Sequence, residues 1–397
     1  MIKRETFLKR IRPFYNSDLI KIITGVRRSG KSTLLNQIIF ELKEQNIEDS
    51  NIIYLNFENL DYSFIKNEMD LHKFIKEKIK NKLKYYLIFD EIQNVENFEK
   101  AINSFRATFD CSIFITGSNG KLLSGELSTH LSGRYVSFKI MPFSFKEMCE
   151  IKNIKKENVN EGHFFDYFNY GGMPQRFLME NDEMIRVYLN DLYNSIVLRD
   201  IMQRSNIKDI DILNRIIEYL VINTSQTFSA KSISNFFKSA NRSVSVETIY
   251  HYLEYITSSL FLNKAVRFDI YGKRVLTRSD KYYLTDPGFA KIKKSGLKAD
   301  IGPMIENIIF NELLHRGYDV YVGKTPKGEV DFIALNNNER VYYQVAYLLA
   351  DEKIIKREFE VFNSIKDNYP KFVLSLDKMD FSQHSIKHKN IIDFLLE

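Results

Sequence analysis

The chain has 397 residues, which predicts two or three domains. Hydrophobic residues make up 44% and charged residues 27%, so the composition indicates packed globular cores and excludes a disordered chain. No uncharged apolar stretch has transmembrane length, the N-terminus lacks a signal-peptide core, and Cys111 and Cys149 belong to no metal-type cluster. These features predict a cytoplasmic protein without a membrane span, a disulfide framework or a zinc site.

Residues 1–145 alternate short apolar runs with helical periodicity, the pattern of a parallel sheet covered by helices. The near-continuous apolar character of the central run suits a sheet that is buried on both faces. The predicted strands are 20–24, 52–57, 85–90, 112–116 and 135–140, and the predicted helices are 34–44, 71–82, 98–107 and 121–131.

The first predicted strand leads into Gly25-Val26-Arg27-Arg28-Ser29-Gly30-Lys31-Ser32-Thr33, which fits the phosphate-loop pattern G-x-x-x-x-G-K-[ST]. Glycines let backbone N–H groups point at a phosphate, and the following helix N-terminus adds partial positive charge. We expect Lys31 to reach the β- and γ-phosphates and the Ser32 hydroxyl to bind Mg²⁺. For Arg27 and Arg28, a phosphate clamp, a subunit contact and a solvent-facing position all stay open.

The predicted strand 85–90 ends in Asp90-Glu91, at the edge where open α/β sheets bind ligands. We expect Asp90 to hold Mg²⁺, directly or through water, and Glu91 to act as general base on the attacking water. The alternative is that two acids simply end a strand. The upstream phosphate loop favours the catalytic interpretation.

Small polar residues end the strand 112–116, and an arginine follows them. Ser118 or Asn119 could orient the lytic water or touch the γ-phosphate, and the sequence does not choose between them. Arg134, sixteen residues after Ser118, is placed to reach the γ-phosphate of a neighbouring subunit, which predicts a homo-oligomer. The alternative for Arg134 is a surface arginine at a helix C-terminus.

Together, these motifs resemble those of the bacterial and archaeal AAA+ ATPases that have an AAA_14-type ATPase domain and a C-terminal DUF4143 region. The matching motifs lie at residues 25–33, 89–93, 116–119, 131–135, 141–145 and 170–174. The resemblance implies ATP rather than GTP and a helical lid, here 146–208. It also implies that the turn at Gly171 is similar to the lid motif of related signalling ATPases, with Arg176 as a candidate nucleotide-sensing residue.

Residues 209–290 predict a winged helix, with helices at 213–222, 229–238 and 245–256 and a hairpin of strands 261–270 and 274–284. Between residues 225 and 281 there are nine Lys/Arg against four Asp/Glu, which favours a surface that meets nucleic-acid phosphates. A lysine-rich solvated surface and a protein-docking module are the alternatives. Candidate base contacts are Ser245, Thr248 and Tyr252, and candidate phosphate contacts are Arg242, Lys273, Arg274 and Arg278.

Residues 291–397 resemble the restriction-endonuclease-like core. Glu306 lies in a predicted helix, and Glu329 and Asp331 lie in a following strand. The next strand has Gln344 where that core has glutamate and Ala346 where it has lysine. Nucleases of this class need paired carboxylates and a cation, so we expect a degenerate site that does not cleave DNA. Weak metal binding by Asp331 with Glu306 or Glu329 stays open.

The sequence therefore predicts an α/β P-loop NTPase core of AAA+ type at 1–145, a lid at 146–208, a winged helix at 209–290 and a degenerate nuclease-like domain at 291–397. Its expected function is Mg²⁺-dependent ATP hydrolysis coupled to DNA binding. The alternatives are a nucleotide-controlled protein-binding switch in signalling or defence and an ATP-regulated nuclease.

Overall fold

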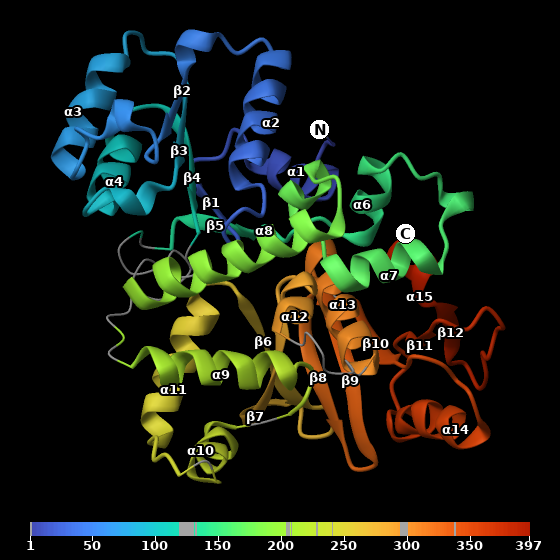
Figure 1. Cartoon of the computed structure of the whole chain (residues 1–397). Helices are drawn as coiled ribbons and strands as arrows, with labels where there is room; N and C mark the ends of the chain where they lie inside the picture. The colour runs from blue at the N-terminus through green and yellow to red at the C-terminus, as the bar shows by residue number, and fades with distance from the viewer. Residues whose placement is uncertain are drawn as a thin grey trace. The chain divides into compact units, whose positions relative to one another are not determined.

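The structure is a computed structural model. It describes residues 2–118, 131, 133–203, 207, 209–227, 229–239, 241–293, 301–336 and 339–397, without the side chains of 198–199, 203, 276–279 and 293. The chain forms two compact units, Met1–Ile140 and Met141–Glu397 (Figure 1). None of the helices in the described ranges is long and apolar enough to cross a membrane.

The first unit is built on a parallel five-stranded sheet in the order β2-β3-β4-β1-β5. Each predicted strand is present, with ends within one residue of the prediction. The strands are β1 Ile20–Thr24, β2 Ile52–Asn56, β3 Tyr85–Asp90, β4 Cys111–Gly117 and β5 Tyr135–Lys139.

Helices cover both faces of this sheet: α2 lies on one side, and α3 and α4 lie on the other (Figure 1). Because β1, β3 and β4 are buried along their whole length, their near-continuous apolar sequences fit this layering. α3 begins earlier than predicted because the Asn67 side chain accepts two backbone N–H groups of its first turn. Residues 121–130 of the predicted helix 121–131 lie outside the described residues. The helices are α1 Glu5–Ile11, α2 Lys31–Glu44, α3 Glu68–Lys78 and α4 Phe98–Thr108.

The second unit begins with the segment expected to be a helical lid, followed by the three helices expected for a winged helix. A π-helical turn, Ile196–Gln203, continues directly from α8. These helices are α6 Phe145–Ile151, α7 Glu161–Tyr170, α8 Asp182–Ser195, α9 Ile210–Ile222, α10 Ala230–Ser239 and α11 Val246–Ser258. Later helices are α12 Gly288–Lys293, α13 Ile301–Arg316, α14 Glu352–Glu360 and α15 Ile391–Leu395.

One seven-stranded sheet, in the order β12-β11-β10-β9-β8-β6-β7, runs through the second unit. The expected wing hairpin, β6 with β7, is part of this sheet, because β6 pairs in parallel with β8 through Arg267–Asp269. β12 was not predicted, since its four residues are Lys, His, Lys and Asn and carry no apolar alternation. The strands are β6 Leu262–Asp269, β7 Arg274–Leu284, β8 Asp319–Thr325, β9 Gly328–Asn336, β10 Glu339–Val345, β11 Lys371–Ser375 and β12 Lys387–Asn390.

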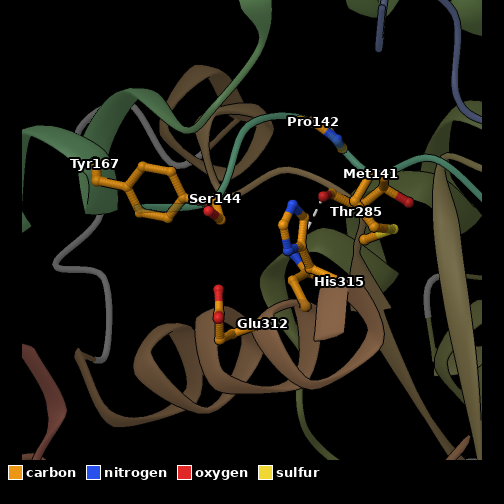
Figure 2. Close-up of a pocket in the computed structure, with 8 residues that line it drawn as sticks. Met141, Pro142, Ser144, Tyr167, Thr285, Glu312 and His315 are labelled. Atoms are coloured by element: carbon orange, nitrogen blue, oxygen red, sulfur yellow. Dashed lines mark hydrogen bonds between the residues drawn. The ribbon is translucent and has the colours of Figure 1, made fainter. Parts of the chain in front are cut away.

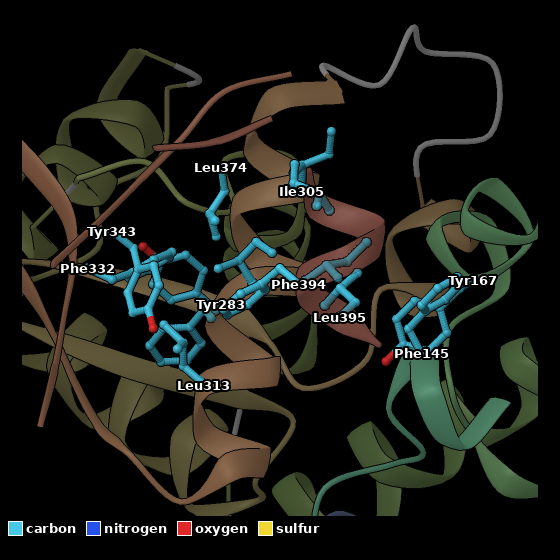
Figure 3. Close-up of a cluster of buried hydrophobic side chains, with 14 of the residues drawn as sticks. Phe145, Tyr167, Tyr283, Ile305, Leu313, Phe332, Tyr343, Leu374, Phe394 and Leu395 are labelled. Carbon is cyan, nitrogen blue, oxygen red and sulfur yellow. The ribbon is translucent and has the colours of Figure 1, made fainter. Parts of the chain in front are cut away.

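A single hydrophobic cluster joins α6 and α7 to α13 and this sheet (Figure 3). Tyr283 of β7 stacks on Phe310 of α13 with ring centroids 4.1 Å apart, and Phe332 of β9 packs against both rings. Phe145 and Tyr167 contribute to the same cluster from the lid segment. The boundaries predicted at 208/209 and 290/291 thus cross a region that shares one core and one sheet.

Candidate functional site

The phosphate loop connects β1 to α2 at the carboxyl edge of the parallel sheet. Gly30 has φ of 96°, a left-handed conformation that favours glycine and lets α2 begin at Lys31. At Gly25, a Cβ atom would lie 2.5 Å from the Ile140 carbonyl oxygen and 2.6 Å from Ser29 Oγ. The two glycines of the pattern are therefore required by backbone conformation and by close packing.

Lys31 points back over the loop and is almost fully buried. Its ammonium group donates to the carbonyl oxygens of Gly25 at 3.2 Å and Val26 at 3.5 Å. It also lies 3.4 Å from Glu91 Oε1, with side-chain exposures of 5% for Lys31 and 12% for Glu91. The structure thus brings together the predicted phosphate-binding lysine and the predicted general base.

The two predicted acids are held by a residue that the sequence reasoning did not assign. Thr116, at the end of β4, donates its hydroxyl proton to Asp90 Oδ1 and accepts a hydrogen bond at 3.0 Å from the Glu91 backbone N–H. Tyr54 donates to the other Asp90 oxygen at 3.1 Å, and burial and the charge of Asp90 raise the pKa of Tyr54. Glu91 itself has φ of 54°, in the left-handed region that residues other than glycine rarely adopt.

Three buried hydroxyl groups at this edge have no hydrogen-bond partner among the described residues. They belong to Thr24 at the end of β1, Ser29 in the loop and Ser118 after β4. Buried polar atoms are normally satisfied, so these unpaired groups fit a site that receives a polar ligand. Together with the glycine-lined loop, they match a nucleotide phosphate chain and its Mg²⁺.

The other predicted residues of the loop occupy varied positions. Ser32 is exposed at the second residue of α2, and Thr33 is half-buried behind it. Arg28 is exposed with φ of 65°, and Arg27 forms an ion pair with Glu58 at 3.4 Å. Because the Arg27 side chain is 16% exposed and paired with Glu58, a purely solvent-facing position does not describe it.

Of the two predicted residues Arg134 and Asn119, the structure describes only Arg134. Asn119 lies outside the described residues. Arg134 is exposed immediately before β5, and its carbonyl oxygen accepts a hydrogen bond from the N–H of Ile20, the first residue of β1. Because β1 and β5 run parallel, Arg134 lies at the amino edge of the sheet, opposite the phosphate loop of its own unit.

Arg176 is buried within the second unit. Its guanidinium pairs with Asp166 at 3.2 Å and lies over the Phe177 ring at 4.3 Å from the centroid. These neighbours give the side chain a packing role in the lid segment. Its predicted nucleotide-sensing role stays a prediction.

The Gly171-Gly172 turn after α7 is closed around the carboxylate of Asp286. The backbone N–H of Gly172 donates to one oxygen at 2.7 Å and that of Gly288 to the other at 2.9 Å. A Cβ at Gly171 would lie 1.7 Å from Asp286 Oδ1, and one at Gly172 would lie 1.9 Å from the Phe143 carbonyl oxygen. The lid motif is therefore tied to the end of β7 by one buried acid, which the sequence reasoning missed.

A small polar pocket lies close to this turn, lined by residues from 141–144, α7, α13 and Thr285 (Figure 2). Glu312 and His315 extend from α13 towards Ser144. His315 Nε2 lies 3.1 Å from Glu147 Oε2, and Glu147 also forms a capping box with Ser144 at the start of α6. The contact between His315 and Glu147 connects α13 to α6. The described residues that line the pocket include none of the predicted site residues.

The expected winged-helix residues are only partly available for DNA. Lys273 and Arg274 are exposed at the hairpin tip, whereas Arg242 forms an ion pair with Asp211. Ser245 caps α11 and bonds the Thr248 N–H at 3.0 Å. Tyr252, expected to share their exposed face, is 8% exposed and packs in the core, so that prediction was wrong. The side chain of Arg278 lies outside the described part of the chain.

The predicted degenerate nuclease residues do come together, around a lysine that was not predicted. Lys281 of β7 pairs with Glu306 at 2.9 Å and with Glu329 at 2.7 Å, and Asp331 Oδ1 is 4.0 Å away. Gln344 accepts from the Asp331 N–H at 3.2 Å and donates to Glu358 at 2.9 Å. The available signal was a lysine directly before the apolar run Tyr282-Tyr283-Leu284.

The sheet order, the phosphate loop and the acid pair define a P-loop NTPase domain of the AAA class. Residues 17–149 match a family described as an AAA domain. Residues 161–299 match a domain of unknown function, DUF8612, where the sequence had suggested a DUF4143 region.

Two curated relatives extend over most of the chain. An uncharacterised protein of Haemophilus influenzae is 39% identical over 402 residues, covering 100% of this chain and 99% of the relative. The uncharacterised protein MJ1544 of Methanocaldococcus jannaschii is 34% identical and covers 88% of this chain and 79% of the relative. The chain therefore belongs to the same family as these two proteins.

Solved structures with similar folds include the Walker-type ATPase PABY2304 of Pyrococcus abyssi. It is 16% identical, with a TM-score of 0.49 over 74% of this chain and 96% of its own. The ORC2 protein of Aeropyrum pernix is 13% identical, with a TM-score of 0.43 over 78% of this chain and 93% of its own. With TM-scores below 0.5, neither similarity carries the functional conclusions that follow.

Proposed function

We propose that the N-terminal domain binds ATP with Mg²⁺ and hydrolyses it. The observation that carries this proposal is the meeting of Lys31, Glu91 and Asp90 beside three unpaired buried hydroxyl groups. The AAA-domain match supports adenine as the base. Buried polar atoms normally have partners, so these hydroxyl groups favour a ligand-binding loop over a purely structural one.

Each residue has a distinct part in this reaction. Lys31 binds the phosphates, Ser32 and Asp90 hold Mg²⁺, and Glu91 takes the proton of the attacking water. When bound, Mg²⁺ neutralises charge on the phosphate oxygens. Since Lys31 pairs with Glu91 in this structure, phosphate binding to Lys31 would release the Glu91 carboxylate to act as base.

Two substitutions test the assignment. We expect Lys31→Ala to abolish binding of a fluorescent ATP analogue, and Glu91→Gln to retain binding while reducing phosphate release by about 100-fold or more. Because glutamine removes the ion pair with Lys31, the Glu91→Gln protein should also bind ATP more tightly than the parent chain. Wild-type turnover in Glu91→Gln would contradict the assignment of the base.

We further propose that α9–α11 and the β6–β7 hairpin form a winged helix that binds DNA. Three helices followed by an antiparallel hairpin support this, as do the exposed cations Lys273 and Arg274 at its tip. The excess of Lys and Arg over Asp and Glu in residues 225–281 is weaker support for DNA binding than the sequence suggested. Four of these cations already form ion pairs within the chain: Arg242, Lys264, Arg267 and Lys281. DNA binding should weaken steeply as salt concentration rises, whereas salt-insensitive or absent binding would favour a protein partner.

A further inference from the structure

The carboxylates of the nuclease-like region surround a lysine side chain that comes from another part of the sheet. Glu306 belongs to α13, Glu329 and Asp331 belong to β9, and Lys281 belongs to β7. The Lys281 side chain is 5% exposed, and its ammonium group lies 2.7 Å and 2.9 Å from the two glutamates. These are the distances of charge-assisted hydrogen bonds.

The three acids of the cluster also have other protein partners. Glu306 Oε1 accepts a second hydrogen bond, from the Tyr283 hydroxyl, at 2.7 Å. The second oxygen of Glu329 pairs with Arg267 at 3.2 Å, and Asp331 Oδ2 accepts from the Val345 N–H at 2.9 Å. Each acid is thus already bonded by side chains or backbone of this chain, and Lys281 and Arg267 supply two positive charges among the three carboxylates.

The electrostatics follow from this arrangement. Burial opposes the charge on Lys281, but Glu306, Asp331 and Glu329 outweigh it and raise the pKa of the ammonium group. Burial raises the pKa of Asp331 as well, and the charge of Glu306 adds to that effect. A divalent cation bound to the same oxygens would sit within a few ångströms of this ammonium and be repelled by it. Among the described residues, no group of three or more acids, histidines or cysteines is arranged to hold a metal.

We propose that Lys281 is a built-in cation that takes the place of a divalent metal ion among these carboxylates. The cluster is then a closed ion network with no capacity for metal-dependent DNA cleavage. The role of the cluster is to hold the β6–β7 hairpin in place. β6 pairs with β8 only over Arg267–Asp269, and Lys281 connects β7 to α13 and β9. This inference does not depend on ATP hydrolysis by the N-terminal domain.

The test measures Mn²⁺ binding by the full-length chain without nucleotide, in an Asp90→Asn background that silences the N-terminal site. Free Mn²⁺ is followed by electron paramagnetic resonance. We expect Glu306→Gln to leave Mn²⁺ binding by this background unchanged. Lys281→Met should gain a site that binds Mn²⁺ at least ten-fold more tightly, and adding Glu306→Gln should remove it. Lys264→Met, which removes an exposed lysine paired with Asp280 on the adjacent strand, is the matched control and should gain nothing.

Three outcomes would overturn the proposal. The first is Mn²⁺ binding by the background chain that Glu306→Gln abolishes, a comparison that stands even if Lys281→Met does not fold. The second is a folded Lys281→Met protein, or a folded Lys281→Met/Glu329→Gln protein with one negative charge fewer, that binds no more Mn²⁺ than the control. Nicking of supercoiled plasmid DNA with Mn²⁺ that Asp331→Asn abolishes would also contradict it.

Discussion

At the scale of single residues, the Thr116 hydroxyl links the two acids of the candidate ATP site. It donates to Asp90 and accepts from the Glu91 N–H, so it fixes both the proposed metal ligand and the proposed base. We predict that Thr116→Val, which keeps the shape of the side chain, lowers ATP turnover by about 10- to 100-fold, as loss of a supporting hydrogen bond commonly does. Turnover should fall more than affinity, which separate binding and phosphate-release assays would show.

The matched control is Thr108→Val at the exposed C-terminus of α4, in the same unit. It makes the same chemical change without touching the acids and should leave turnover intact. Equal turnover in Thr116→Val and Thr108→Val would show that Thr116 does not position Asp90 and Glu91.

The second prediction at this scale concerns Gly25. A methyl group there would meet the Ile140 carbonyl oxygen at 2.5 Å, so Gly25→Ala must displace the loop or the backbone beside it. We expect loss of nucleotide binding and a lower melting temperature. Gly302→Ala is the control, because a Cβ at Gly302 has nothing within 4 Å. Normal ATP binding by Gly25→Ala would mean that the loop adopts another conformation with nucleotide.

At the scale of elements, Asp286 connects the turn after α7 to the end of β7. Burial raises the pKa of its carboxyl group to about 6 from an ordinary value of 3.8, although two backbone N–H groups and Arg176 oppose the shift. A raised pKa in the folded state means that the proton stabilises the fold. That contribution is complete below about pH 4 and is lost as the pH rises through about 6.

We therefore predict that the free energy of unfolding of the parent chain, relative to Asp286→Asn, falls by roughly 2 kcal/mol between pH 4 and pH 7. Asparagine has no such titration, so the difference between the two proteins isolates Asp286 from other acids. Chemical denaturation of both proteins across this pH range measures it. A difference that does not change with pH would show that Asp286 titrates normally.

The hairpin tip gives the second prediction at this scale. Lys273 and Arg274 are exposed, and the neighbouring Tyr271 hydroxyl donates to the Ser364 carbonyl oxygen at 2.6 Å, which fixes the tip. We predict that Lys273→Glu/Arg274→Glu weakens DNA binding for all sequences and reduces the slope of affinity against salt by about two, as expected for two lost phosphate contacts. The control, Lys353→Glu/Lys356→Glu on exposed positions of α14, changes the net charge equally. Equal weakening by both pairs would argue against a contact at the tip.

At the scale of the whole molecule, the place of Arg134 bears on assembly. It is exposed at the amino edge of the sheet, whereas the phosphate loop lies at the carboxyl edge. Arg134 is therefore proposed to complete the site of a neighbouring copy rather than its own. We predict that Arg134→Ala lowers turnover by about 1,000-fold, the effect of losing such an arginine.

Mixing variants distinguishes this from a role within one subunit. Lys31→Ala cannot bind ATP but keeps Arg134, so adding it to Arg134→Ala should restore part of the turnover in mixed oligomers. Turnover in the mixture equal to that of the separate proteins would exclude a shared site.

The candidate ATP site could be predicted largely from the sequence because its residues follow the ends of apolar strands. Gly25 to Thr33, Asp90 and Glu91 were assigned correctly to one edge, since parallel strands bring their carboxyl ends together. Thr116 was not assigned, although it lies on the neighbouring strand, because which side chains bond across an edge depends on register. Tyr252 was wrongly assigned to the exposed face of its helix, because its spacing along the helix fits both the exposed face and the face that packs in the core.

What the sequence by itself determined was local: strand and helix positions, the phosphate loop, and the presence of Gln344 and Ala346 where the nuclease core that it resembles has glutamate and lysine. These features arise from periodicity and from motifs contained in a few consecutive residues. Only the tertiary structure decided that the hairpin joins the C-terminal sheet, that Asp286 closes the Gly171-Gly172 turn and that Lys281 lies among Glu306, Glu329 and Asp331. The physical reason is that each contact joins side chains or strands far apart in the chain, and burial selects these pairings only once the core has formed.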